Sequence, residues 1–316
     1  MRGKSWGAVV ALHLGLVAVL FALNFVLPVY HQGVLARVMV LAVYAIGYNI
    51  AFGYTGLLSL GHAMFFAAGL YGAGLMGLHF GMAAVPAWAF GTGAGALLAL
   101  VVGALALRTA GVSFMIVTLM FAQAVYLTIL YFGDITHGDD GFVVPSVSRT
   151  LAGIDLSQQH PRYLVGWALF SVALLFSLWL VRAPFGRVLV AIRENEERAR
   201  LLGYDTGARK LGALVISGTI SAASGAAYGL LFGYVGASFA GVQYSIFALL
   251  WVLLGGAGTV LGPFVGTLFM FYLIDLATEV TDAYMLIAGV VLVGLTLFAP
   301  QGIVGEVRRR LWRDLP

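Results

Sequence analysis

The sequence is a nearly unbroken series of long apolar runs, and this feature constrains the fold more than any other. Of its 316 residues, 61% are hydrophobic and only 9% are charged, whereas a soluble domain carries about a quarter charged residues. Runs of about 20 apolar residues are long enough to cross a bilayer as helices. The chain is therefore predicted to be an all-α polytopic membrane protein, with residues 1–316 forming one transmembrane domain.

Ten segments have the length and composition expected of spans, or come close to it. The first, 7–29, is too long for the core of a signal peptide, so we expect it to be retained. The eighth, 244–256, is short and ends in glycines, and we expect a broken helix there rather than a full crossing. The predicted spans are 7–29, 34–52, 62–80, 84–107, 112–132, 163–182, 211–232, 244–256, 263–280 and 283–299.

The basic residues fall mainly on one side of this threading. With the N-terminus in the cytoplasm, fourteen of the 17 Lys and Arg residues lie inside, and only Arg37, Arg149 and Arg162 lie outside. Cytoplasmic loops of membrane proteins carry such an excess of Lys and Arg. Both termini and the loop 183–210 are thus predicted to be cytoplasmic, and the loop 133–161 external. The external loop is equally consistent with a docking surface and with a solvated connector.

The loop 183–210 concentrates charge in an otherwise apolar chain. Nine of the eighteen residues from 193 to 210 are charged, which is more than a connector between two spans requires. Its apolar residues fall on one stripe of a helix, which predicts a single amphipathic helix from 188 to 202 along the membrane. The residues of this stripe are Val188, Ile192, Ala199 and Leu202.

The same loop contains signals that would stabilise and end this helix. Acidic residues precede basic ones by four positions, and each such pair stabilises a helix by about 0.2–0.5 kcal/mol. Gly203 can supply a left-handed stop, and Asp205 can cap the following helix. The predicted pairs are Glu194 with Arg198 and Glu196 with Arg200.

A short internal echo points to a repeat. Residues 52–56 read Phe-Gly-Tyr-Thr-Gly and residues 232–236 read Phe-Gly-Tyr-Val-Gly, and a broken, glycine-rich segment follows each. In the predicted threading the first lies at the cytoplasmic end of its span and the second at the external end. Such opposed halves would form an inverted repeat, which is common in transporters.

The stretch from Gly53 to Phe66 is the best candidate for a transport pathway. Its glycines let the backbone leave helical geometry, and its hydroxyl groups can satisfy freed backbone groups or cap a helix beginning near His62. A helix N-terminus at membrane depth can attract a carboxylate. The alternative is that the glycines only permit close packing and that Ser59 and His62 are structural caps. The candidate pathway residues are Thr55, Gly56, Ser59, Gly61, His62 and Phe65.

The charged loop also resembles a known family. Gly186-Arg187, residues 191–196 and Leu202-Gly203 resemble the cytoplasmic signature of the permeases of branched-chain amino-acid ABC importers. Residues 197–203 are similar to the Glu-Ala-Ala-x-x-x-Gly core that such permeases present to their ATPases, with Arg198 in place of the middle alanine. The resemblance implies an ATPase-coupling role for Arg193, Glu194, Asn195, Glu196, Glu197, Ala199 and Gly203.

Further stretches extend the resemblance from about residue 35 to 305. Residues 53–66 resemble the membrane signature of the family, although Leu57 stands where glutamine is usual. The order of the matches is that of the family, and the longer, LivM-type permease fits best. The remaining matches lie at 117–119, 139–141, 254–259 and 300–302.

The resemblance implies a particular assembly in the bacterial inner membrane. It comprises a second homologous permease, two ATPases that hold ATP and Mg²⁺, and a periplasmic substrate-binding protein. The implied cargo is a branched-chain or other hydrophobic amino acid, or a related small amide or carboxylate. The binding protein of such an importer carries most of the selectivity, so the cargo stays open within these classes.

The residues themselves also require an outside source of energy. The chain has no cysteine, no H-E-x-x-H and no G-x-x-x-x-G-K-[ST] sequence, so it lacks the loop that cradles ATP phosphates. We expect no cofactor, catalytic residue or metal site in this chain, and hence no enzyme activity. Its net charge of +4 follows membrane topology and does not indicate nucleic-acid binding.

Two other functions remain open at this stage. A secondary transporter of small polar solutes, driven by an ion gradient, would need an indispensable intramembrane acid, for which only Asp275 qualifies. A charge at the centre of a span costs about 2.5–3.5 kcal/mol, so we expect Asp275 near the outer face. A scaffold subunit without a pathway is the third possibility.

Asn49 and Gln123 are expected to form hydrogen bonds between helices.

Overall fold

The computed structural model describes residues 6–151, 153–280, 283–299 and 301–311. Several residues used in the threading and the motif matches lie outside these ranges, namely Arg2, Lys4, Pro300 and Arg313.

The ten predicted spans correspond to ten helices in the same order, and the all-α polytopic fold is confirmed. Seven helices of the described chain are long and apolar enough to cross a membrane, with α2 counted together with the π-helical turn η1 that continues it. The ten helices are α1 (Trp6–Val26), α2 (Val29–Asn49) with η1 (Ile50–Tyr54), α3 (Ala63–Phe80), α4 (Ala84–Ala106), α5 (Val112–Tyr131), α7 (Gln159–Arg182), α10 (Thr206–Phe232), α11 (Val242–Gly255), α12 (Gly262–Val280) and α13 (Tyr284–Phe298).

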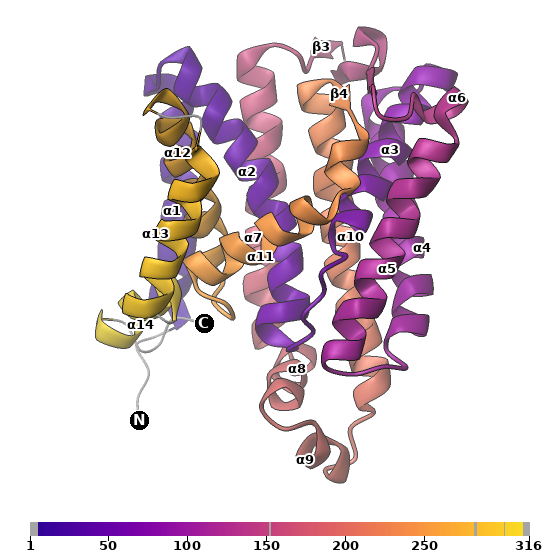
Figure 1. The fold of residues 1–316 in the computed structure, drawn as a ribbon. Coiled ribbons are helices and arrows are strands. Elements are labelled where there is room, and N and C mark those ends of the chain that lie inside the picture. Colours follow the sequence, from indigo (N-terminus) through magenta and orange to yellow (C-terminus); the bar gives the residue numbers. More distant parts are fainter. Residues whose placement is uncertain (1–5, 152, 281–282, 300, 312–316) are drawn as a thin grey trace.

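Short elements occupy the two ends of the bundle (Figure 1). One end holds α8 (Pro184–Glu194), α9 (Glu196–Leu201) and α14 (Gly302–Leu311). The start of α1 lies at this end too, because the Arg182 guanidinium, at the end of α7, lies 3.9 Å from the Trp6 ring centroid. The predicted threading requires this grouping. The opposite end holds α6 (Gly133–Thr136), β1 (Phe142–Val143), η2 (Ser146–Arg149), β2 (Thr150–Leu151), β3 (Ile154–Asp155) and β4 (Tyr234–Val235).

The loop 133–161 is folded onto the end of α10. Strand β1 pairs antiparallel with β4, which follows α10, and β2 pairs with β3. Nε and Nη2 of Arg149 donate hydrogen bonds of 2.8 Å to the carbonyl oxygens of Leu230 and Leu231. Arg37 and Arg162 both lie over the Phe232 ring, at 5.1 and 5.5 Å. The three arginines predicted to be outside therefore gather around one helix end.

The two halves of the bundle repeat one arrangement in opposite directions. Helices α2 and α10 pack antiparallel, since Gly47 near the end of α2 lies against Ser217 and Ser221 while Arg37 near its start lies over Phe232. After α2 and η1 the chain turns back into the bundle before α3, and after α10 it turns back through β4 and η3 (Ala237–Ala240) before α11. Helix α4 packs on α10, and α12 packs on α2. This is the geometry of an inverted repeat.

Helix α11 begins inside the bundle. With 14 residues it is about 21 Å long, whereas the hydrocarbon core of a bilayer is about 30 Å thick. It runs obliquely from the centre of the bundle toward the end that holds α8 and α9 (Figure 1). The prediction of a broken helix in this segment is confirmed.

Candidate functional site

The charged loop forms two helices instead of the single helix predicted from 188 to 202. Helix α8 ends at Glu194, and Asn195 takes an extended conformation with φ −161° and ψ 102°. Its side-chain oxygen accepts a hydrogen bond of 2.8 Å from the backbone N–H of Arg198. Asn favours such N-cap positions over helix interiors because its side chain replaces a missing backbone partner. The apolar periodicity alone did not reveal this break.

The break also changes the predicted ion pairs. Glu194 and Arg198 lie on either side of it, and the ion pairs among the described residues do not include them. Glu196 lies 3.4 Å from Arg200, as predicted, and it also accepts a hydrogen bond from Lys210 in α10. Partial burial opposes ionisation of Glu196, but the Lys210 hydrogen bond and charge outweigh it and hold the pKa of this carboxyl below its ordinary value. Lys210 thus ties α9 to α10.

Apolar side chains are exposed at the tip of the loop. Val188, Ile192 and Ala199 are buried together, as the stripe predicted. Leu202 is 72% exposed instead of joining them, and Leu201 beside it is 88% exposed. The tip therefore presents two neighbouring apolar side chains to solvent within a charged loop.

The turn after α9 has the predicted geometry. Gly203 has φ +89°, the left-handed conformation that glycine adopts without strain. A Cβ added there would meet no atom within 4 Å. The Asp205 side chain accepts a hydrogen bond of 2.9 Å from the Ala208 N–H and caps α10. Glu197 lies on the exposed surface of α9, so Glu197 and Gly203 both face open space.

Arg193, at the end of α8, connects the charged loop with both halves of the bundle. Its Nη1 donates a hydrogen bond to the carbonyl oxygen of Gly53 in η1. Its aliphatic part covers Gly56, where a Cβ would lie 3.3 Å from Cγ of the arginine. Nη1 also lies 2.8 Å from the place of a Cβ on Gly258, in the turn after α11. The guanidinium therefore bridges the two glycine-rich turns that follow α2 and α11.

Asn49 holds the same two turns together. Its Nδ2 donates to the Thr259 carbonyl oxygen and its Oδ1 accepts from the Gly258 N–H, both at 2.9 Å. The predicted interhelical role of Asn49 is confirmed. A Cβ on Gly53 would overlap the Asn49 side chain, so only glycine fits beside it. We call Arg193, Asn49, Gly53 and Gly258 the arginine clamp.

A groove of about 480 Å³ separates the clamp from the turn between α4 and α5. It brings two of the candidate pathway residues, Thr55 and Gly56, together with the coupling residues 193–196. Thr55 is buried and its hydroxyl donates to the Ile50 carbonyl oxygen at 2.8 Å, while Gly56 has φ +78°. These two residues thus belong structurally with the charged loop.

The other candidate pathway residues lie deeper, where α3 and α11 begin. The Ala63 N–H, the first of α3, donates a hydrogen bond of 2.8 Å to the Ser245 hydroxyl in the first turn of α11. The Ser59 hydroxyl accepts from the Gly61 N–H at 3.3 Å, and the Ser59 carbonyl accepts from the Tyr48 hydroxyl at 2.9 Å. We call this meeting point of the two helix starts the half-helix junction.

His62 fixes the junction to α10. It occupies the N-cap position of α3 but makes no capping hydrogen bond with its side chain, so the alternative that His62 is a side-chain cap is wrong. Instead Nε2 lies 3.0 Å from the Ser221 hydroxyl and 3.2 Å from that of Ser217. The ring is fully buried between Tyr48 and Phe65, at 4.9 and 5.1 Å. Phe65 is likewise part of the packing and is fully buried.

Sequence patterns did not indicate the partners of these residues. Ser217, Ser221 and Ser245 are single hydroxyl residues in apolar helices, and their contacts with His62 and Ala63 join segments more than 150 positions apart. The side of α10 that faces α2 carries serines at helical spacing, namely Ser217, Ser221 and Ser224. This serine stripe is the signal that could have shown which face of α10 meets the junction.

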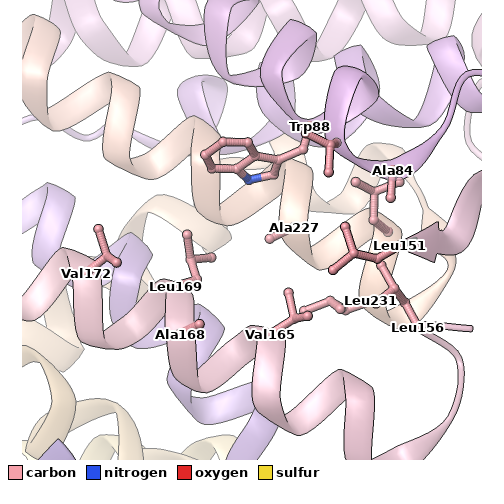
Figure 2. A pocket seen from close by; sticks show the side chains of 12 residues that line it. Ala84, Trp88, Leu151, Leu156, Val165, Ala168, Leu169, Val172, Ala227 and Leu231 are labelled. Atoms are coloured by element: carbon pink, nitrogen blue, oxygen red, sulfur yellow. The ribbon is translucent and has the colours of Figure 1, made fainter. Parts of the chain in front are cut away.

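A separate apolar cavity is not part of the candidate site. It has a volume of about 370 Å³ and lies between α4, α7 and α10, with Leu151 and Leu156 of the loop 133–161 at its rim (Figure 2). The indole N–H of Trp88 is the only polar side-chain group in its lining, and it donates to the Ala223 carbonyl oxygen at 3.0 Å. The cavity therefore offers no free polar group to a hydrophilic cargo.

Removing the cap of α9 should loosen the tip of the charged loop. An N-cap Asn→Ala change costs about 1 kcal/mol, equivalent to a roughly fivefold larger open population. For Asn195→Ala we therefore expect about fivefold faster trypsin cleavage after Arg198 and Arg200, measured on the folded protein in detergent. Glu194→Ala, which removes an exposed side chain without a capping bond, should leave the rate unchanged. Equal rates in the two variants would contradict the capping role.

The fold and the site define a polytopic transport permease, in which broken half-helices meet inside the bundle and a charged two-helix loop lies at one end. Residues 30–299 match the family described as "Branched-chain amino acid transport system / permease component". The chain belongs to this family of ABC-type permease subunits, and its LivM-type resemblance is confirmed.

Curated relatives cover most of the chain. The high-affinity branched-chain amino acid transport system permease protein LivM of Escherichia coli (strain K12) is 28% identical over 86% of this chain and 69% of its own length. The protein of the same name from Salmonella typhimurium is 26% identical over the same shares. The autoinducer 2 import system permease protein LsrC of Salmonella paratyphi B is 28% identical over 48% of this chain and 44% of its own. No solved structure matches the chain.

Proposed function

We propose that this chain is one permease of an ABC importer in the bacterial inner membrane, and that it takes up branched-chain or other hydrophobic amino acids, or related small amides and carboxylates. Its partners are a second homologous permease, two ATPases that bind ATP and Mg²⁺, and a periplasmic substrate-binding protein. The charged loop, both termini and α14 face the cytoplasm. The match to the family and the LivM relatives support this assignment.

The arginine clamp is the observation that carries the mechanism. The exposed leucines of the tip, Leu201 and Leu202, insert into a cleft of the ATPase. When ATP closes the ATPase pair, α9 moves together with α10, because Glu196 and Lys210 join these two helices. Helix α8 follows because it packs on both of them. Arg193 transfers this movement to Gly53 and Gly258. Both halves of the inverted repeat then shift at once, which is how such repeats alternate access.

Substitution of Gly203 should uncouple ATP hydrolysis from uptake. A Trp at position 203 extends from the tip into the space assigned to the ATPase, because a Cβ there meets nothing within 4 Å. We expect Gly203→Trp, and likewise the charge reversal Glu197→Arg, to reduce ATP-driven uptake by at least about tenfold, equivalent to 1.4 kcal/mol of coupling. The measurement is uptake and ATP hydrolysis in the same proteoliposomes.

Gly81 provides a matched control for this substitution. It also has positive φ, +59°, and its Cβ would also meet nothing within 4 Å. Gly81→Trp therefore introduces the same backbone strain at the opposite end of the bundle, where α3 ends. Uptake should persist in Gly81→Trp and fail in Gly203→Trp. Unimpaired uptake in both Gly203→Trp and Glu197→Arg would refute the coupling role.

Energy dependence separates this function from an ion-gradient transporter. Copurification of the tagged chain in mild detergent should yield an ATPase pair and a second permease. Reconstituted with the binding protein, the assembly should accumulate cargo when ATP is present on the ATPase side and ion gradients are clamped at zero. Accumulation that follows an ion gradient without ATP would support the secondary transporter instead.

A further inference from the structure

A second cavity, of about 250 Å³, lies between α2, α11 and α12. Its lining combines aromatic rings with a single carboxylate, in contrast to the aliphatic cavity of Figure 2. The aromatic residues are Tyr244, Phe247 and Trp251 of α11 and Phe271 of α12, and the carboxylate is that of Asp275. The charged loop does not line this cavity, so it is a distinct place in the fold.

The aromatic rings of α11 form a continuous wall. Phe247 and Trp251 are stacked, with ring centroids 6.2 Å apart and planes inclined by 11°. Tyr244 lies edge-on to both, at 6.4 Å from each centroid. Aromatic faces attract cations through their quadrupole, and Trp does so best. This wall therefore suits the cationic or the apolar part of a small organic molecule.

Asp275 has no charged partner in the described part of the chain. Its Oδ2 accepts a hydrogen bond of 2.7 Å from the Tyr30 hydroxyl at the start of α2. None of the ion pairs among the described residues includes it. The carboxylate is half-buried toward the end of an apolar helix, and a partly desolvated charge without a counter-ion costs free energy there too. A ligand cation would offset this cost.

The position of the cavity connects it to the transport machinery. Tyr30 lies in the first turn of α2, which begins at the end of the bundle opposite α8 and α9 (Figure 1), and Asp275 is bonded to it there. Tyr244 precedes Ser245, which holds the first N–H of α3 at the half-helix junction. The Tyr244 ring also stacks on Tyr44 of α2, with centroids 5.8 Å apart. A ligand in the cavity would contact the start of α11 directly.

We propose that this cavity binds the primary ammonium group of the cargo, with Asp275 as its counter-ion and the aromatic wall covering its apolar part. The proposal rests on the proposed function and narrows it, because amides and carboxylates that lack an ammonium group do not fill the site. The volume of about 250 Å³ is below the usual range for drug-sized ligands, about 300–1,000 Å³, and suits a small amino acid.

The test uses the fluorescence of Trp251 in the purified full chain, reconstituted in lipid nanodiscs. The probes are leucine, 3-methylbutylammonium, which keeps the ammonium without the carboxylate, and 4-methylpentanoate, which keeps the carboxylate without the ammonium. We expect leucine and 3-methylbutylammonium to give saturable changes that Trp251→Phe removes, and 4-methylpentanoate and sodium chloride to give none. Asp275→Asn should weaken leucine binding by at least about tenfold, as loss of a charged hydrogen-bond partner does.

A matched variant and a folding check keep the result interpretable. Asp134→Asn, a change of an exposed carboxylate in α6 outside the cavity, should bind leucine like the parent. Helical content and the thermal midpoint show whether Asp275→Asn is folded. If this variant does not fold, the difference between leucine and 4-methylpentanoate binding to the parent chain tests the ammonium site by itself. Four outcomes would overturn the proposal. They are equal binding of leucine and 4-methylpentanoate, unaltered leucine affinity in folded Asp275→Asn, binding of sodium in place of ammonium, and no response to either ammonium probe.

The experiment is independent of the proposed function. It needs neither ATPase nor binding protein, so absence of ammonium binding leaves ATP-driven uptake to be judged by reconstitution. If, conversely, the chain binds ammonium while its reconstituted assembly shows no ATP-driven uptake, the missing uptake would refute the importer assignment. The cavity would then remain a cation site.

Discussion

Arg193→Ala is expected to abolish ATP-driven uptake while the protein remains folded and inserted. The guanidinium donates to the Gly53 carbonyl oxygen and lies beside Gly258, so its loss disconnects the charged loop from both glycine-rich turns. A hydrogen bond from a charged group is worth about 1.5–3 kcal/mol, and we expect uptake to fall by at least about tenfold. Hydrolysis by the associated ATPases should continue, because the tip formed by α9 is unchanged.

Arg187→Ala is the matched control for this change. Arg187 lies on the exposed side of the same helix, α8, and it carries the same charge without reaching the turns after α2 and α11. Its removal should leave uptake within about twofold of the parent, as for most surface substitutions. If Arg193→Ala transports as well as Arg187→Ala, the arginine clamp has no part in coupling.

Gly61→Ala should cause a large loss of stability. A Cβ at this position would overlap the carbonyl oxygen of Thr118 and lie 2.6 Å from its carbonyl carbon, both in the backbone of α5. Backbone cannot move aside as a flexible side chain can, so the turn that precedes α3 must move away from α5 and the half-helix junction must open. Overpacking of a well-packed core costs about 1–3 kcal/mol and occasionally more. We expect the upper end of this range, seen as a lower thermal midpoint.

Gly93→Ala tests whether this effect comes from the close approach. Gly93 lies within α4, and a Cβ there meets nothing within 4 Å. Alanine is favoured over glycine inside a helix by about 1 kcal/mol, so Gly93→Ala should be neutral or slightly stabilising. A thermal midpoint for Gly61→Ala as high as that for Gly93→Ala would show that the turn before α3 and helix α5 are not in this contact.

The sequence predicted the helices better than it predicted their contacts. Length and apolarity decide which segments can cross a bilayer, and all ten predicted segments are helical. The short 244–256 segment was recognised as broken because its glycines and its length both oppose a full crossing. These are local properties, which the residues of each segment determine by themselves.

The charged loop shows where local reasoning fails. The apolar stripe from Val188 to Leu202 has helical spacing, yet Asn195 interrupts it. Whether the helix continues or a cap begins a new one depends on how much apolar surface each arrangement buries. Leu202 stays 72% exposed within the described chain, so a continued stripe would gain little there. Helix α8 packs against α7 and η1, and α9 packs against α10, and no window of sequence contains these contacts.

The pathway residues show the same limit at longer range. The glycines and hydroxyl groups from Thr55 to His62 correctly marked backbone that leaves helical geometry. That His62 meets Ser217 and Ser221, and that Ala63 meets Ser245, follows from the antiparallel packing of the two halves. The echo between residues 52–56 and 232–236 pointed to that packing, and the serine stripe of α10 could have added the face involved.

The central claim is that the tip of the charged loop faces the cytoplasm and contacts an ATPase. The chain contains no cysteine, so Leu201→Cys introduces a single thiol at a position of α9 that is 88% exposed, and Val147→Cys introduces one in the loop 133–161. A membrane-impermeant maleimide should label Leu201→Cys in inverted vesicles stripped of ATPase, and bound ATPase should block the reaction. In intact spheroplasts it should label Val147→Cys and leave Leu201→Cys unmodified. Labelling of Leu201→Cys from the outside of intact spheroplasts would contradict the account.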